Sequence, residues 1–94
     1  MIKVEFTQTA QDDYLFMLEE ISNRSLDEAL ILDEKMDALI DNLRKFKYLC
    51  PPSKRFPKFR RCVVTRHIAL VYELGKNSIT VISIYDTRSN SPFQ

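Results

Sequence analysis

The sequence has little of several residues on which other classes of protein depend. Its 94 residues include one glycine, one histidine, two cysteines and no tryptophan. A structural zinc site needs a cluster of cysteine and histidine ligands, so we expect no metal site. No apolar run approaches the roughly 20 residues that a membrane helix needs, and the N-terminus shows no signal-peptide pattern. We therefore expect a cytoplasmic protein with no membrane partner and no cofactor.

The two cysteines, Cys50 and Cys62, do not have a metal-ligand spacing or a Cys-x-x-Cys spacing. Cytosolic proteins normally keep their thiols reduced, whereas disulfides concentrate in secreted proteins. We therefore expect both thiols to be reduced and at least partly buried.

The composition nevertheless supports a hydrophobic core. Apolar residues make up 45% of the chain and aromatic residues 11%, whereas disordered chains have fewer apolar residues and a larger net charge. A chain of this length buries roughly 60–65% of its unfolded surface when it folds. Since the sequence shows no repeat and no linker, we expect residues 1–94 to form a single domain.

Charge is divided sharply along the chain, although the net charge is only +1. Residues 1–41 contain eleven acidic and three basic side chains, a net charge of −8. Residues 42–72 contain nine basic side chains and no acidic one, and residues 73–94 contain two of each. Local fields of this kind steer partners more than the total charge does. The basic segment is therefore the first candidate for a binding surface.

Two amphipathic helices are predicted in the acidic part. The first covers about residues 9–23 and is capped by Thr7 or Thr9, with Thr9 and Asp12 resembling a capping box. A second helix begins near Ser25 or Asp27, and its apolar side chains recur at steps of three and four, the strongest periodicity in the chain: Ala29, Leu32, Met36, Leu39, Ile40, Leu43 and Phe46. The short connection predicts an antiparallel helical hairpin.

Strands are predicted on either side of this hairpin. Residues 2–6 alternate apolar and polar, and three further strands are expected at Phe59–Val64, Ile68–Leu74 and Ile79–Tyr85. The last of these is apolar on both faces, so it should be central in the sheet. Prolines at positions 51 and 52 exclude further helix, and residues 47–58 are expected to form an extended basic loop. The fold class is therefore α+β with the order β-α-α-β-β-β, a helical hairpin packed on a small, mostly antiparallel sheet.

Cations and aromatic rings alternate in the basic segment before the second predicted strand. Its basic residues are Lys54, Arg55, Lys58, Arg60 and Arg61, followed by Arg66, and Phe56 and Phe59 lie among them. Such a pattern suits a polyanion, because cations contact phosphates and rings stack on bases. It equally suits an acidic protein partner. The alternative is a solvated loop whose two phenylalanines enter the core.

A few residues could move a proton or hold an anion. His67 could act as a general base, although a lone histidine is more often a packing residue. Tyr72 and Tyr85 lie at what we interpret as matching points of neighbouring strands, and most such tyrosines are core residues. Arg88 follows the last strand, where an exposed arginine on a rigid element can grip phosphate or carboxylate.

The whole chain resembles the RelE/ParE superfamily of bacterial toxins. The resemblance lies in the order of elements, in the strand His67–Tyr72, and in the ending Val81–Pro92, which is similar to the strand-Asp-Thr-Arg-x-Asn-Pro ending of ParE-like members. Ala69 stands where RelE-type nucleases carry an arginine, and Phe93 stands in place of a terminal tyrosine. These differences favour the ParE-like branch.

The resemblance implies the toxin of a type II toxin–antitoxin system, of the kind associated with growth inhibition and plasmid stabilisation. Its partner would be a cognate antitoxin, and by family analogy its target would be DNA gyrase. The alternatives are a RelE-like endoribonuclease that cuts mRNA at the ribosome, and a non-toxic partner that retains the fold. Candidate catalytic residues are Arg61, His67, Tyr85 and Arg88. Candidates for binding the target or the antitoxin are Lys54, Arg55, Lys58, Arg60, Arg61, Arg66 and Arg88.

Overall fold

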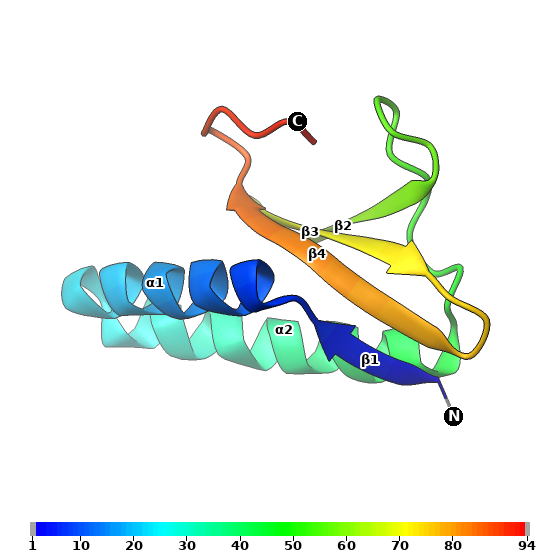
Figure 1. The fold of residues 1–94 in the computed structure, drawn as a ribbon. Coiled ribbons are helices and arrows are strands. Elements are labelled where there is room, and N and C mark those ends of the chain that lie inside the picture. Colours follow the sequence, from blue (N-terminus) through cyan, green and yellow to red (C-terminus); the bar gives the residue numbers. More distant parts are fainter. Residues whose placement is uncertain (1, 94) are drawn as a thin grey trace.

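Two antiparallel helices lie against one face of a four-stranded sheet (Figure 1). The computed structural model describes residues 2–93. Its elements follow the predicted order: β1 (Lys3–Phe6), α1 (Gln8–Arg24), α2 (Leu26–Lys45), β2 (Phe59–Thr65), β3 (Ile68–Leu74) and β4 (Ser78–Asp86). The α+β class, the helical hairpin and the single sheet are therefore confirmed.

The sheet has the strand order β1-β4-β3-β2. Strand β1 runs parallel to β4, with Val4 opposite Ile79, and the other two pairs of neighbours are antiparallel. Strand β4 lies between β1 and β3, as its apolar character on both faces predicts. The prediction of a mostly antiparallel sheet with a central last strand is confirmed.

Short polar caps start both helices. The Thr7 hydroxyl accepts a hydrogen bond from the Ala10 amide (3.1 Å), and the Ser25 hydroxyl accepts one from the Glu28 amide (3.2 Å). The predicted capping box at Thr9 is wrong, because Thr7 follows β1 directly and Thr9 already lies within the helix. Among residues 2–93, no helix combines the length and the apolar character that a membrane span requires.

The main core lies between the helices and the sheet. Its fully buried members include Tyr72, Leu43, Leu70, Ile79 and Val81. The predicted stripe of the second helix is largely confirmed, since five of its side chains are buried: Ala29, Leu32, Met36, Ile40 and Leu43. Phe46 was wrongly placed in the core, because α2 ends at Lys45 and the helical periodicity stops there.

A smaller cluster covers the opposite face of the sheet, which we call the outer face. Ala69, Val71 and Tyr85 are buried there beneath Phe59, Ile82 and Phe93. The rings of Phe56, Phe59 and Phe93 meet edge-on or tilted, with centroids 5.6–6.4 Å apart, so residues 87–93 pack over this face. Tyr72 pairs with Val81 and Tyr85 with Ala69. The two tyrosines therefore occupy different positions along the ladder and belong to different cores, so the predicted match is wrong.

The loop between α2 and β2 folds back along the edge of β2. The Ser53 amide donates to the Phe59 carbonyl (2.7 Å), and the Arg61 amide donates to the Pro51 carbonyl (3.0 Å). This reversal brings the α-carbons of Cys50 and Cys62 to 5.2 Å, and the two sulfurs form a disulfide. Both cysteines are buried, as predicted, but the expectation of reduced thiols is wrong.

Reduction of this disulfide should destabilise the fold. Closing a loop of this size restricts the unfolded chain and stabilises the native state by about 2–4 kcal/mol. Chemical unfolding with and without dithiothreitol measures the change in the free energy of unfolding. A Cys50→Ala/Cys62→Ala double variant is the control, because its stability should not respond to the reductant. Equal stability of the wild-type chain in both conditions would contradict the prediction.

Candidate functional site

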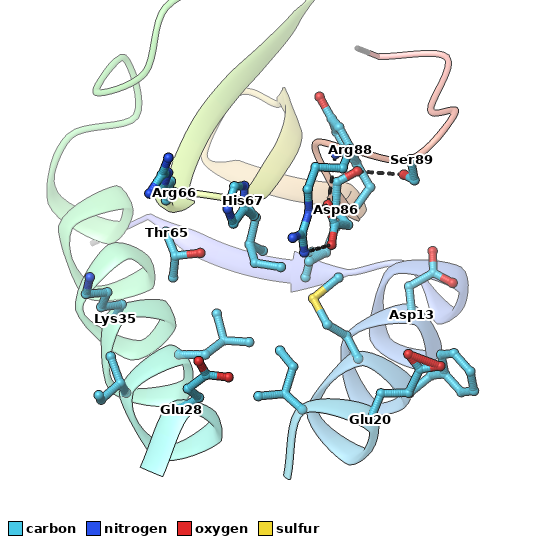
Figure 2. Close-up of a pocket in the computed structure, with 18 of the residues that line it drawn as sticks. Asp13, Glu20, Glu28, Lys35, Thr65, Arg66, His67, Asp86, Arg88 and Ser89 are labelled. Atoms are coloured by element: carbon cyan, nitrogen blue, oxygen red, sulfur yellow. Dashed lines mark hydrogen bonds and ion pairs between the residues drawn. The ribbon is translucent and has the colours of Figure 1, made fainter. Parts of the chain in front are cut away.

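The tip of the helical hairpin projects past the end of the sheet (Figure 1). A groove lies beside this tip. This groove, which we call the hairpin groove, has a volume of about 890 Å³. The facing sides of α1 and α2 form its floor, and the β2–β3 turn and the end of β4 form its upper wall (Figure 2). Its position follows from elements that are themselves well packed, so its shape is built into the fold.

The floor of the hairpin groove is apolar. The side chains involved are Phe16, Met17, Ile21, Ile31 and Leu32. Phe16 and Ile31 are half or more exposed, and Met17 and Ile21 are partly buried. Leu32 belongs to the main core and Met17 and Ile21 pack against it, whereas Phe16 and Ile31 extend the apolar surface into solvent. An exposed apolar surface that is rimmed by charge is typical of an interaction site.

Opposite charges line the two sides of the hairpin groove (Figure 2). The helices contribute mainly carboxylates, from Asp12, Asp13, Glu20 and Glu28, together with the cations of Arg24 and Lys35. The sheet end contributes the cations of Arg66 and Arg88, together with His67 and the carboxylate of Asp86, which pairs with Arg88. A ligand in the groove therefore meets an apolar floor between a mainly acidic and a mainly basic wall, which would fix its orientation.

Arg88 is held by Asp86 at the sheet end of the groove. Its guanidinium donates two hydrogen bonds to the carboxylate, from Nε to Oδ1 (3.0 Å) and from Nη2 to Oδ2 (2.7 Å), and its amide donates a third (2.8 Å). These bonds hold the pKa of Asp86 at about 2, below its ordinary 3.8. The Thr87 amide also bonds the His67 carbonyl (2.8 Å), which joins this turn to the β2–β3 turn. Arg88 is exposed as predicted, but it already has a carboxylate partner.

The predicted basic residues do not form one surface. Arg66 and Arg88 both border the hairpin groove, whereas Lys54, Arg55 and Lys58 are exposed on the loop before β2. Arg60 turns back and donates to the carbonyls of Tyr48 and Cys50. Its neighbour Arg61 donates from Nε to the Tyr85 hydroxyl (2.8 Å). Successive residues of a strand point to opposite faces, so the side chains of Arg60 and Arg61 lie on opposite faces of the sheet.

Three of the four candidate catalytic residues, His67, Tyr85 and Arg88, border the hairpin groove. The Tyr85 hydroxyl is directed to the outer face, where it accepts a hydrogen bond from Arg61 and donates one to the Phe93 carbonyl (3.1 Å). Within residues 2–93, no three histidine, cysteine, aspartate or glutamate side chains are grouped so that they could hold a metal ion.

Phe16 and Ile31 were absent from the residues that the sequence singled out. Each directly precedes a more buried apolar residue of its helix, Met17 and Leu32 respectively. They widen the apolar face of each helix beyond the stripe that a core contact needs. That extra width was the available signal for a second contact surface.

Both the sequence and the fold are similar to those of toxins of type II toxin–antitoxin systems. The sequence matches, over residues 4–90, the family described as the ParE toxin of the type II toxin–antitoxin system parDE. The chain therefore belongs to the ParE toxin family, which confirms the predicted resemblance. No curated protein sequence matches the chain.

Solved structures of similar fold come from the same group of toxins. The chain is similar to a chromosomal ParDE system from P. aeruginosa, with a TM-score of 0.74 and 13% identity over 92% of this chain and 96% of that one. A YoeB/ParE toxin from Agrobacterium tumefaciens gives 0.65 and 20%, over 90% and 98%. A heterotetrameric YoeB–YefM toxin–antitoxin complex from Staphylococcus aureus gives 0.60 and 16%, over 88% and 93%.

The contact between Asp86 and Arg88 predicts a measurable titration. In an Arg88→Ala variant the pKa of Asp86 should rise from about 2 towards its ordinary 3.8. Carboxyl-carbon NMR during an acid titration measures it, and Arg66→Ala, at the same groove, should leave the pKa near 2. Because the folded-state pKa is the lower one, the pair stabilises the fold above about pH 4 and this contribution is lost as the pH falls towards 2. An unchanged pKa in Arg88→Ala would contradict the contact.

Proposed function

We propose that this ParE-family toxin inhibits bacterial growth in the cytoplasm by binding a cellular target, and that a co-encoded antitoxin silences it by occupying the hairpin groove. DNA gyrase is the target that family analogy favours. The observation that supports the antitoxin contact is the exposure of Phe16 and Ile31, two apolar side chains on the floor of the groove. An isolated domain would leave these side chains in water, so a stable partner would gain by burying them.

An amphipathic helix is the form of antitoxin segment that suits the groove. Its apolar face would lie along the floor formed by α1 and α2, as in other helix-in-groove complexes. Basic side chains on one flank would face Glu20 and Glu28, and acidic ones on the other would face Arg66. The Staphylococcus aureus complex of similar fold is itself a toxin–antitoxin assembly, which supports a partner of this kind.

The placement of the candidate catalytic residues favours action by binding. Three of the four candidates border the hairpin groove, but the Tyr85 hydroxyl is engaged by Arg61 and the Phe93 carbonyl, and Arg88 is engaged by Asp86. A phosphoryl-transfer site would need donors that converge on one developing charge. Exposed cations such as Lys54, Arg55, Lys58 and Arg66 are available for an anionic target.

Induced expression tests the proposed activity. We expect growth arrest with a DNA-damage response and intact transcripts, and we expect co-expression of the neighbouring antitoxin gene to restore growth. Colony counts, a damage-response reporter and primer extension on abundant messages measure these effects. Transcripts cut within codons would replace the proposal with an mRNA endoribonuclease. Unimpaired growth would replace it with a non-toxic partner that retains the fold.

A matched pair of substitutions tests the groove as the antitoxin site. Ile31 lines the groove and is 50% exposed, whereas Leu30 is 54% exposed and lies outside the groove lining. Complete burial of an isoleucine contributes about 1.5–3 kcal/mol, and Ile31 has about half of its surface left to bury, so Ile31→Glu should weaken antitoxin binding by about three- to tenfold. Leu30→Glu should change the affinity little. Isothermal titration calorimetry with the purified antitoxin measures both, and equal effects would place the antitoxin elsewhere.

A further inference from the structure

A second apolar surface lies at the other end of α2 from the hairpin groove. The turn after this helix exposes Phe46 (61%), Tyr48 (63%) and Leu49. The turn lies near the start of β1 (Figure 1). Together with Ile2, its side chains line a shallow hollow of about 630 Å³. About ten residues of helix separate it from Lys35 at the groove, a distance of roughly 15 Å. One ligand side chain therefore does not reach both places.

This turn is held firmly from below. The buried Tyr72 hydroxyl donates to the Lys47 carbonyl (2.8 Å) and accepts from the Cys50 amide (3.4 Å). Arg60 donates to the carbonyls of Tyr48 and Cys50, and the disulfide fixes Cys50 to β2. Hydrogen bonds and the disulfide therefore anchor the backbone of this turn on the side that faces the core. The rings of Phe46 and Tyr48 are exposed on this anchored backbone, and such preorganisation lowers the entropy that a partner must overcome.

Cations surround the hollow. Lys45, Lys47 and Lys76 all border it, and among residues 2–93 no carboxylate side chain contributes to its lining. The amines and guanidinium nearby also lie over the exposed ring: Lys47 Nζ is 5.5 Å and the Arg60 guanidinium carbon 5.0 Å from the centre of Tyr48. In contrast to the hairpin groove, which carries both signs, this surface is electrostatically complementary only to an anionic ligand.

We propose that this surface, which we call the lysine–aromatic surface, binds a short acidic segment of a partner protein. One bulky apolar side chain of that segment occupies the hollow between Ile2, Phe46 and Leu49. Its carboxylates pair with Lys45, Lys47 and Lys76. The aliphatic walls contributed by Ile2 and Leu49 favour a protein side chain over a nucleobase, which stacks best on aromatic rings. The segment binds apart from the hairpin groove, so the inference does not depend on what the groove holds.

Selection from a phage library of random peptides against the full chain tests the proposal for an acidic segment of any sequence. We expect enriched peptides to combine aspartate or glutamate with a bulky apolar residue. Fluorescence anisotropy should show at least a tenfold loss of affinity for Phe46→Ser and for Lys45→Glu. Leu26→Ser and Lys3→Glu are the matched controls, because both residues are exposed and lie outside the lining of the hollow. Neither control should weaken binding more than about twofold.

Three results would overturn the proposal. The first is the absence of any enriched acidic peptide. The second is a set of enriched peptides that bind Phe46→Ser as well as wild type but lose affinity for Ile31→Glu, which would assign them to the hairpin groove. The third is tight binding of an oligothymidine strand that Phe46→Ser weakens while no peptide binds, which would make the surface a nucleic-acid site. Circular dichroism of each variant confirms that it is folded, so a loss of affinity reports on contact.

Discussion

The parallel pairing of β1 with β4 determines where everything else lies. It ends with Phe6 opposite Val81, and α1 begins two residues after Phe6. From Val81, β4 continues for five residues, about 16 Å, whereas the 17 residues of α1 extend about 25 Å. The hairpin therefore outruns the sheet, and α2 returns along it to the opposite end. Both the uncovered groove floor and the turn that displays Phe46 are consequences of that single register.

Most of the architecture could be predicted from the sequence, because periodicity and turn residues report directly on local structure. The strand Ile68–Leu74 has the predicted bounds, and the others differ by a residue at one or both ends. Side-chain direction near element ends was harder to predict. Phe46 continues the helical pattern in sequence, yet the backbone has left the helix there. Arg60 and Arg61 are equivalent in the basic run of the sequence. Because successive strand residues point to opposite faces, Arg60 bonds a loop carbonyl and Arg61 bonds the Tyr85 hydroxyl.

Contacts that depend on chain reversal were not accessible from local patterns. Cys50 and Cys62 meet because residues 51–53 fold back beside β2, and no spacing rule encodes that path. The division of charge along the sequence is only partly reproduced in the structure. The basic segment was the first candidate for a binding surface, yet the acidic side chains Asp12, Asp13, Glu20 and Glu28 also border the hairpin groove. The basic segment supplies the groove wall, a structural anchor and an exposed loop instead of one continuous patch.

The three phenylalanines on the outer face link parts of the chain that are distant in sequence. Phe93 packs against Phe56 and Phe59, so one aromatic cluster joins residues 87–93 to the loop that carries Lys54, Arg55 and Lys58. Phe59, Phe93 and Ile82 together cover Ala69 and Val71, which are fully buried. A partner that displaced Phe93 would therefore expose the small outer core and would remove an aromatic neighbour from the cationic loop at the same time.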